Sequence, residues 1–139
     1  MPSEATTVRE LMQRNVRTVG RNDALSLADE LMRENAIRHI PVLDADGIVC
    51  GVLSQRDLFR GALLKALGYG GRAEESTLKS MVVKEAIGSE LFTIGPDVTV
   101  ADAARLMMRE KVGCLPVVDG KQLVGILTET DLLKVVAET

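Results

Sequence analysis

Two short stretches of this sequence each place a hydroxyl side chain three positions before an aspartate. The first, Gly51–Asp57, contains Ser54, and the second, Gly125–Asp131, contains Thr128. Each stretch starts at a glycine, continues as an apolar run and ends where helical spacing begins. A strand followed by a helix would bring the hydroxyl and the carboxylate to one edge of a sheet. There the carboxylate could accept charge-assisted hydrogen bonds from two adjacent hydroxyl groups of a sugar.

The same pattern also fits a purely structural role. Ser54 and Thr128 can act as helix N-caps, and an aspartate is favourable in the first turn of a helix. For one copy alone the two interpretations stay open. The copies, however, belong to a longer repeat: Val8 and Val83 are 75 positions apart, as are Pro41 and Pro116. After a one-residue deletion in the second turn the offset is 74, and this repetition favours the binding role.

Composition excludes several classes of function. The chain has 139 residues, of which 46% are apolar, so it can bury a sizeable core. It carries 17 Lys and Arg against 20 Asp and Glu, and only 2% of its residues are aromatic, which argues against nucleic acid binding. No apolar run approaches the roughly 18 residues of a membrane span, and the start lacks a signal-peptide core. We therefore expect a soluble, cytoplasmic protein that binds neither nucleic acid nor membrane.

Catalytic and metal-binding signatures are also missing from the sequence. Cys50 and Cys114 are isolated, and with His39 as the only histidine they are too few for a structural zinc site. We expect both cysteines to be small buried hydrophobes in a reducing compartment. One histidine cannot supply a triad to each repeat, and no glycine loop has a phosphate-binding spacing. The sequence predicts no enzyme, no metal and no cofactor.

Hydrophobic spacing predicts a lead-in and then the order strand, helix, strand, strand, helix in each half. In the first half we expect a helical lead-in over 8–12, extended residues 17–19, a helix capped by Asn22 or Asp23, strands over 40–43 and 48–54, and a helix over about 56–67. In the second half we expect the corresponding elements over about 92–94, 98–111, 115–118, 123–128 and 130–137. Four apolar residues should face the core from the first long helix: Leu27, Ala28, Leu31 and Met32. An Asp-Gly step marks the first hairpin, and a glycine-rich stretch joins the halves.

This order predicts an α/β (α+β) fold. Three short strands per half can be covered by helices on one face, so the other face must pack against the second half. We expect two pseudo-twofold-related repeats with their sheets packed face to face. Two equivalent clefts would result, with the aspartates at their mouths.

Further repeated motifs carry a family resemblance. Thr18-Val19 returns as Thr93-Ile94, and His39–Val42 returns as Cys114–Val117, each pair preceding its glycine-to-aspartate stretch. The chain resembles a tandem pair of cystathionine beta-synthase (CBS) domains, also called a Bateman module, of the stand-alone type. Repeat 1 would cover residues 7–65, a linker 66–77, and repeat 2 residues 78–138.

The resemblance implies a regulatory module that binds adenosine-containing ligands, such as AMP, ADP, ATP or S-adenosylmethionine. It also implies that each site combines the Ser/Thr-x-x-Asp motif of one repeat with the first strand and proline region of the other. Carried over residue by residue, one site comprises Thr18, Arg38, His39, Ile40, Pro41, Thr128 and Asp131. The other comprises Ser54, Asp57, Thr93, Gly113, Cys114, Leu115 and Pro116.

The two predicted sites differ in charge. Arg38 and His39 form a cationic pair suited to phosphate oxygens, whereas Gly113 and Cys114 offer no charge. We therefore expect the site with Asp131 to be the better one for a phosphorylated nucleotide, although a solvated Arg38 and a structural His39 fit the same sequence. A ligand-free structural or dimerisation module remains the alternative function. Apolar positions on the helices that end each repeat also predict a homodimer, whose regulated partner the sequence does not identify.

Overall fold

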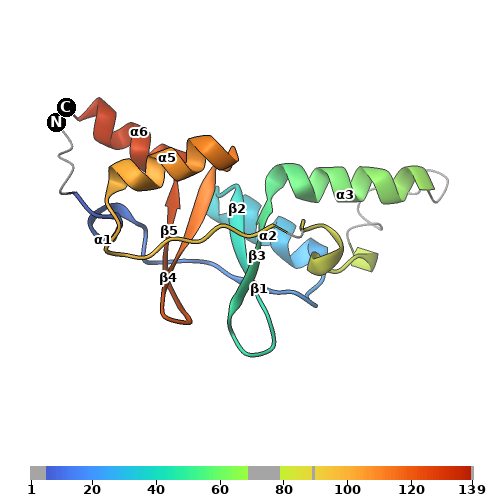
Figure 1. The fold of residues 1–139 in the computed structure, drawn as a ribbon. Coiled ribbons are helices and arrows are strands. Elements are labelled where there is room, and N and C mark those ends of the chain that lie inside the picture. Colours follow the sequence, from blue (N-terminus) through green and yellow to red (C-terminus); the bar gives the residue numbers. More distant parts are fainter. Residues whose placement is uncertain (1–5, 69–78, 89, 139) are drawn as a thin grey trace. The chain divides into compact units, whose positions relative to one another are not determined.

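The computed structural model describes residues 6–68, 79–88 and 90–138. The chain forms two compact units (Figure 1). One, here called the continuous unit, comprises Arg17–Leu91, and the other, the split unit, combines Met1–Val16 with Phe92–Thr139. The predicted linker falls largely on residues 69–77, which lie outside the described residues.

The continuous unit contains a three-stranded sheet. Its elements are β1 (Val19–Gly20), α2 (Leu25–Asn35), β2 (His39–Leu43), β3 (Val49–Ser54), α3 (Gln55–Gly68) and the 3-10 helix η1 (Val83–Glu85). The strand order is β1-β2-β3, with β1 parallel and β3 antiparallel to β2. Helix α2 packs against β2 and α3. The predicted order of elements is confirmed for this half.

Two expectations about α2 were wrong. The N-cap is Ala24, because the Asp23 carboxylate accepts the Gly20 N–H at 2.7 Å and closes the preceding turn instead. The buried face comprises Leu25, Ala28 and Met32, while Leu27 is 40% exposed. Since the helix starts at Leu25, its i, i+3, i+7 positions define the core face and leave Leu27 outside it.

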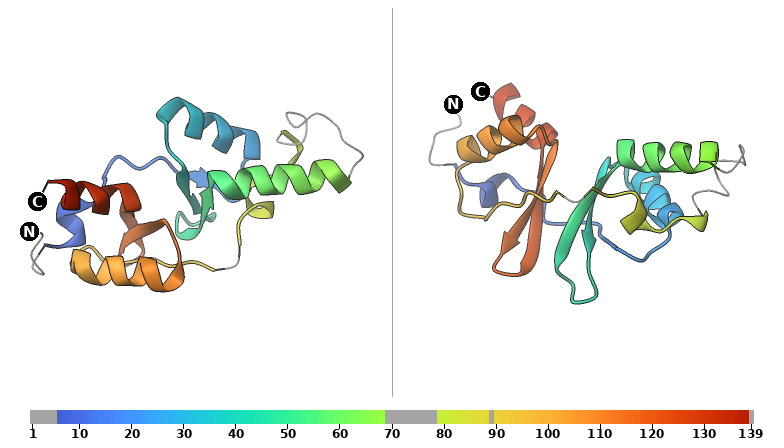
Figure 2. Two further views of the ribbon diagram at one scale, coloured as in Figure 1. Left: turned by 90° about the horizontal axis from the view of Figure 1, so that it is seen from above. Right: turned by 45° about the vertical axis from the view of Figure 1, so that its right-hand side comes forward.

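The split unit contains a two-stranded antiparallel sheet. Its elements are α1 (Val8–Leu11), α5 (Val100–Glu110), β4 (Cys114–Asp119), β5 (Gln122–Thr128) and α6 (Glu129–Ala137). Helix α1 packs against α5 and β5, as can be followed in Figure 2. Thr99 caps α5 by accepting the Asp102 N–H at 3.2 Å.

The extended residues expected over 92–94 do not form a strand. Only Ile94 pairs, through a single parallel bridge to Val117. In the continuous unit the corresponding ladder continues because the Arg21 N–H donates to the Leu43 carbonyl at 2.9 Å. The matching position in the second repeat is Pro96, which has no N–H to donate, so the pairing stops.

The helical lead-in of each repeat packs against the other repeat. The lead-in of repeat 1 hydrogen-bonds to the second repeat, with Val8 N–H donating to the Val98 carbonyl at 2.9 Å. The lead-in of repeat 2 hydrogen-bonds to the first repeat, with Val83 N–H donating to the Asp23 carbonyl at 2.9 Å. The compact units therefore divide the chain at different points from the sequence repeats, whose boundaries stay a sequence prediction.

The glycine that opens each aspartate motif lies directly against a lead-in. A Cβ on Gly125 would stand 2.6 Å from the Met12 sulfur and 3.0 Å from the Gln13 carbonyl oxygen. A Cβ on Gly51 would stand 2.8 Å from the end of the Ile87 side chain, with no backbone atom among its nearest neighbours. Both glycines allow close approach, but only at Gly125 does a backbone atom limit the available space.

We predict that Gly125→Ala destabilises the protein more than Gly51→Ala does. Overpacking typically costs about 1–3 kcal/mol, and the Gln13 carbonyl cannot rotate away as the tip of Ile87 can. Urea unfolding of both variants measures the difference in the free energy of unfolding. Equal losses in the two variants would contradict the close packing at Gly125.

Candidate functional site

Asp131 lies at the start of α6 and is only 3% exposed. Its Oδ2 accepts hydrogen bonds from the Thr128 backbone N–H at 2.9 Å and from the Thr128 hydroxyl at 3.1 Å. Its Oδ1 accepts a hydrogen bond from the Gln13 side-chain amide at 3.0 Å. Three donors therefore satisfy this buried carboxylate, as a charge away from water requires.

Asp57 occupies the matching position at the start of α3 and is half-buried. Its Oδ2 accepts the Ser54 N–H at 3.2 Å, while the Ser54 hydroxyl accepts the Asp57 N–H at 3.0 Å. These reciprocal bonds confirm that Ser54 caps its helix. Within the described part of the chain, no side chain donates to the Asp57 carboxylate as Gln13 does to Asp131.

The sheet registers bring further predicted site residues next to these motifs. His39 pairs with Ser54 in the continuous unit, and Cys114 pairs with Thr128 in the split unit. Arg38 is exposed beside its strand start. Each unit thus collects a strand start, a hydroxyl and a carboxylate at one edge of its own sheet.

Other predicted residues contribute to the core instead. The side chains of four are fully buried in β2 and β4: Ile40, Pro41, Leu115 and Pro116. Thr18 and Gly113 are half-buried, and Thr93 is exposed. Each predicted site draws residues from both units, and these combinations stay predictions.

Cys114 is a free, buried thiol, as expected, whereas Cys50 is free and only half-buried, so the expected burial was wrong for Cys50. Burial, and to a smaller extent the negative charge of Asp131, raise the pKa of the Cys114 thiol from 9.0 to about 12. Cys114 therefore stays protonated at neutral pH. It acts at this edge as a small apolar group and not as a nucleophile.

Gln13 is the residue at this site that sequence reasoning missed. The repeat offset already shows that this position differs between the repeats, because the residue 75 positions after Gln13 is Gly88. One lead-in thus carries an amide side chain where the other has none. The offset shows the difference, but only the fold shows that the amide reaches Asp131.

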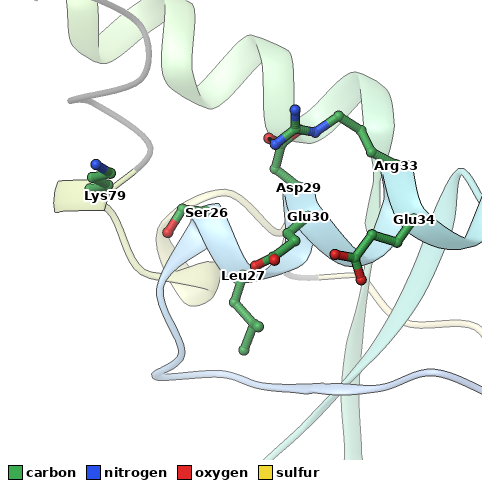
Figure 3. A pocket seen from close by; sticks show the side chains of 7 residues that line it. All are labelled: Ser26, Leu27, Asp29, Glu30, Arg33, Glu34 and Lys79. Carbon is green, nitrogen blue, oxygen red and sulfur yellow. Dashed lines mark ion pairs between the residues drawn. The ribbon is translucent and has the colours of Figure 1, made fainter.

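A separate hollow of about 620 Å³ lies on the outer surface of α2 in the continuous unit (Figure 3). It is lined by Ser26, Leu27, Asp29, Glu30, Arg33, Glu34 and Lys79. Arg33 pairs with Asp29 at 3.0 Å, and Glu30 and Glu34 add negative charge. The hollow contains none of the predicted site residues, and its carboxylates would repel a phosphate.

Neither a metal-ligand cluster nor a membrane-spanning helix is found among the described residues. Among residues 6–68, 79–88 and 90–138, no group of three or more His, Cys, Asp or Glu side chains is placed to hold a metal ion. No helix in these same ranges combines the length and apolar character needed to cross a membrane.

Comparison with known proteins defines the family. The CBS domain family model matches residues 8–63 and 83–138, so the chain belongs to the CBS domain family and carries two copies of the domain. An uncharacterized protein of Methanocaldococcus jannaschii is 33% identical over 136 residues, which cover 96% of this chain. The chain spans only 32% of that relative's length.

Solved structures agree with this assignment. The AcuB protein of Vibrio cholerae is 30% identical with a TM-score of 0.78, and the match covers 95% of this chain and 90% of that one. CBSX2, solved in complex with AMP, is 26% identical with a TM-score of 0.77, and the match covers 96% and 97% of the two chains. The mixed α/β fold is that of a CBS domain pair.

We predict that Cys114 resists alkylation in the folded protein, even at pH 9, where a thiol of ordinary pKa is half ionised. Iodoacetamide labelling followed by mass spectrometry measures the rate, with the half-buried Cys50 as internal reference. In Asp131→Asn the pKa of Cys114 should fall, because a negative charge beside the thiol is removed. In urea both cysteines should react at similar rates. Equal labelling rates in the native protein would contradict the burial of Cys114.

Proposed function

We propose that this chain is a regulatory module that binds an adenosine-containing ligand, such as AMP, ADP, ATP or S-adenosylmethionine. The observation that carries the proposal is the hydroxyl and aspartate pair at the strand-to-helix junction of both units. A carboxylate held by backbone N–H groups suits a ribose diol, because two hydroxyl groups can donate to it. The likeness to CBSX2, which was solved with AMP, supports an adenine nucleotide.

We further propose that the site with Asp131 and Thr128 is completed by Thr18, Arg38 and His39. In this arrangement the carboxylate binds ribose, and the two cationic side chains bind phosphate. The second site would combine Asp57 and Ser54 with Thr93 and the 113–116 segment, which offers no charge to phosphate. The buried prolines and their neighbours would contribute backbone groups, because their side chains lie in the core.

A ligand-free structural or dimerisation module is the second candidate. The observation that favours it is the hydrogen bonding of Asp131, which already accepts three bonds within its own unit. In that case the motif serves only to start α6. Ligand binding distinguishes the two candidates directly.

A thermal-shift panel of AMP, ADP, ATP, S-adenosylmethionine and NAD tests the proposal. A ligand that binds only the folded state stabilises it by about 2.7 kcal/mol at a hundredfold excess over its dissociation constant. We expect at least one adenosine ligand to raise the melting temperature. If all five leave it unchanged at millimolar concentration, the ligand-free alternative is favoured.

With the ligand identified, we predict that Asp131→Ala abolishes most of the affinity and that Asp57→Ala has a smaller effect. Loss of a charged hydrogen-bond acceptor costs roughly 1.5–3 kcal/mol, or about one to two decades in affinity. Calorimetry measures both variants. Glu129→Ala, which removes an exposed carboxylate from the same helical turn as Asp131, is the matched control. The reverse order of effects would show that the preferred site was assigned wrongly.

We also propose a homodimer. Helix α3 exposes Phe59, Leu63 and Leu67 by 50%, 60% and 70%, and their i, i+4, i+8 spacing makes one apolar stripe. On α6, Leu133 and Val136 are similarly exposed, at 65% and 67%. Contiguous apolar surface of this kind usually marks an interface.

We predict that light scattering gives a mass near twice 15.0 kDa at micromolar concentration. Leu63→Lys should shift the mass toward the monomer, because a charge would be buried in the interface. A wild-type mass near 15.0 kDa would exclude the dimer under those conditions.

A further inference from the structure

Gln13 is held firmly in place by its backbone. Its N–H donates to the Ile126 carbonyl at 2.9 Å, and its carbonyl accepts the Ile126 N–H at 2.9 Å. This isolated antiparallel bridge ties the residue after Met12 to β5. The backbone of Gln13 is thereby held beside β5, and the side-chain amide reaches Asp131 at the start of α6.

The Gln13 amide occupies one oxygen of the Asp131 carboxylate. Its Nε2 donates to Oδ1 at 3.0 Å, while Thr128 supplies both bonds to Oδ2. An ionised carboxylate offers about four lone-pair sites, so three donors leave about one. A ribose diol needs two, and Asp131 is buried while Gln13 itself is exposed. On this count the amide has to leave Oδ1 before both hydroxyl groups can bind.

The continuous unit lacks this arrangement. The residue that matches Gln13 is Gly88, which has no side chain and whose ideal Cβ would meet nothing within 4 Å. Among the described residues, Asp57 accepts only the Ser54 N–H, on Oδ2. Within this same part of the chain, nothing donates to its Oδ1. The two repeats therefore present the same motif in two different states of hydrogen bonding.

We propose that Gln13 is a specificity-determining residue that competes with the ribose of a nucleotide for Asp131. A nucleotide enters this site only by displacing the amide from Oδ1. The affinity of the Asp131 site is thus lower than its carboxylate alone would give. This inference rests on the proposed function and adds the residue that sets the relative affinity of the two sites.

The test is calorimetric titration of AMP into the full chain carrying Asp57→Ala. In this variant Asp131 is the only one of the two motif aspartates that is left. Adding Gln13→Ala should tighten AMP binding roughly tenfold, since one hydrogen bond to a charged group no longer has to be broken. The variant should fold, because the side chain is exposed and the backbone bridge to Ile126 is kept. Asn15→Ala, an exposed change in the same segment, should leave the affinity unchanged.

A second variant separates hydrogen bonding from bulk. Gln13→Met keeps the length of the side chain but has no donor, so it should tighten AMP binding as Gln13→Ala does. Tighter binding by the alanine variant alone would show steric blocking and overturn competition for the carboxylate.

Nuclear magnetic resonance supplies a readout on the residue itself. Saturating AMP should shift the Gln13 side-chain amide signal and speed its exchange with water. If AMP binds but this signal and the affinity of Gln13→Ala are unchanged, the inference fails while the proposed function stands. If neither the wild type nor any variant binds AMP or the other adenosine ligands, both fail together.

Discussion

The pair of backbone hydrogen bonds between Gln13 and Ile126 is the constraint on which the split unit depends. It attaches a segment from the start of the chain to a strand more than a hundred positions later. Gly125 has to be a glycine because Met12 and Gln13 lie against it. The same attachment completes the buried core around Val8 and Met12 and directs an amide to Asp131. This one long-range pairing therefore links the packing of the split unit to the hydrogen bonding of Asp131.

The hydroxyl and aspartate motif stabilises the fold whether or not a ligand binds to it. In both units its aspartate accepts a backbone N–H at a helix start, which stabilises that helix and fixes the carboxylate. A carboxylate that is already oriented loses little further freedom on binding, and such preorganisation favours affinity. The structural and binding interpretations of Ser54 and Thr128 are therefore compatible. The two aspartates differ in one additional donor: Gln13 donates to Asp131, whereas the matching residue near Asp57 is Gly88.

Much of this fold could be predicted from the sequence because its signals are local. The Asp-Gly step placed the first hairpin, and Gly47 indeed adopts a positive φ of 79°. The ends of the helices were harder to predict. The C-caps of α2 and α5 are Ala36 and Lys111, both in the left-handed conformation, which neither residue type indicates. The exchange of lead-ins could not be predicted, because a repeat offset identifies equivalent residues but not the copy on which they pack. For the same reason the candidate aspartates were found from sequence, and the partner of one of them, Gln13, was not.

The most direct test of the central claim is a crystal structure of the full chain grown with saturating AMP. Under the proposed function, the ribose hydroxyls of AMP should lie within hydrogen-bonding distance of the carboxylate of Asp131 or Asp57. At Asp131 the amide of Gln13 should have moved away from Oδ1. A structure in which AMP is bound without contact to either aspartate would contradict the account.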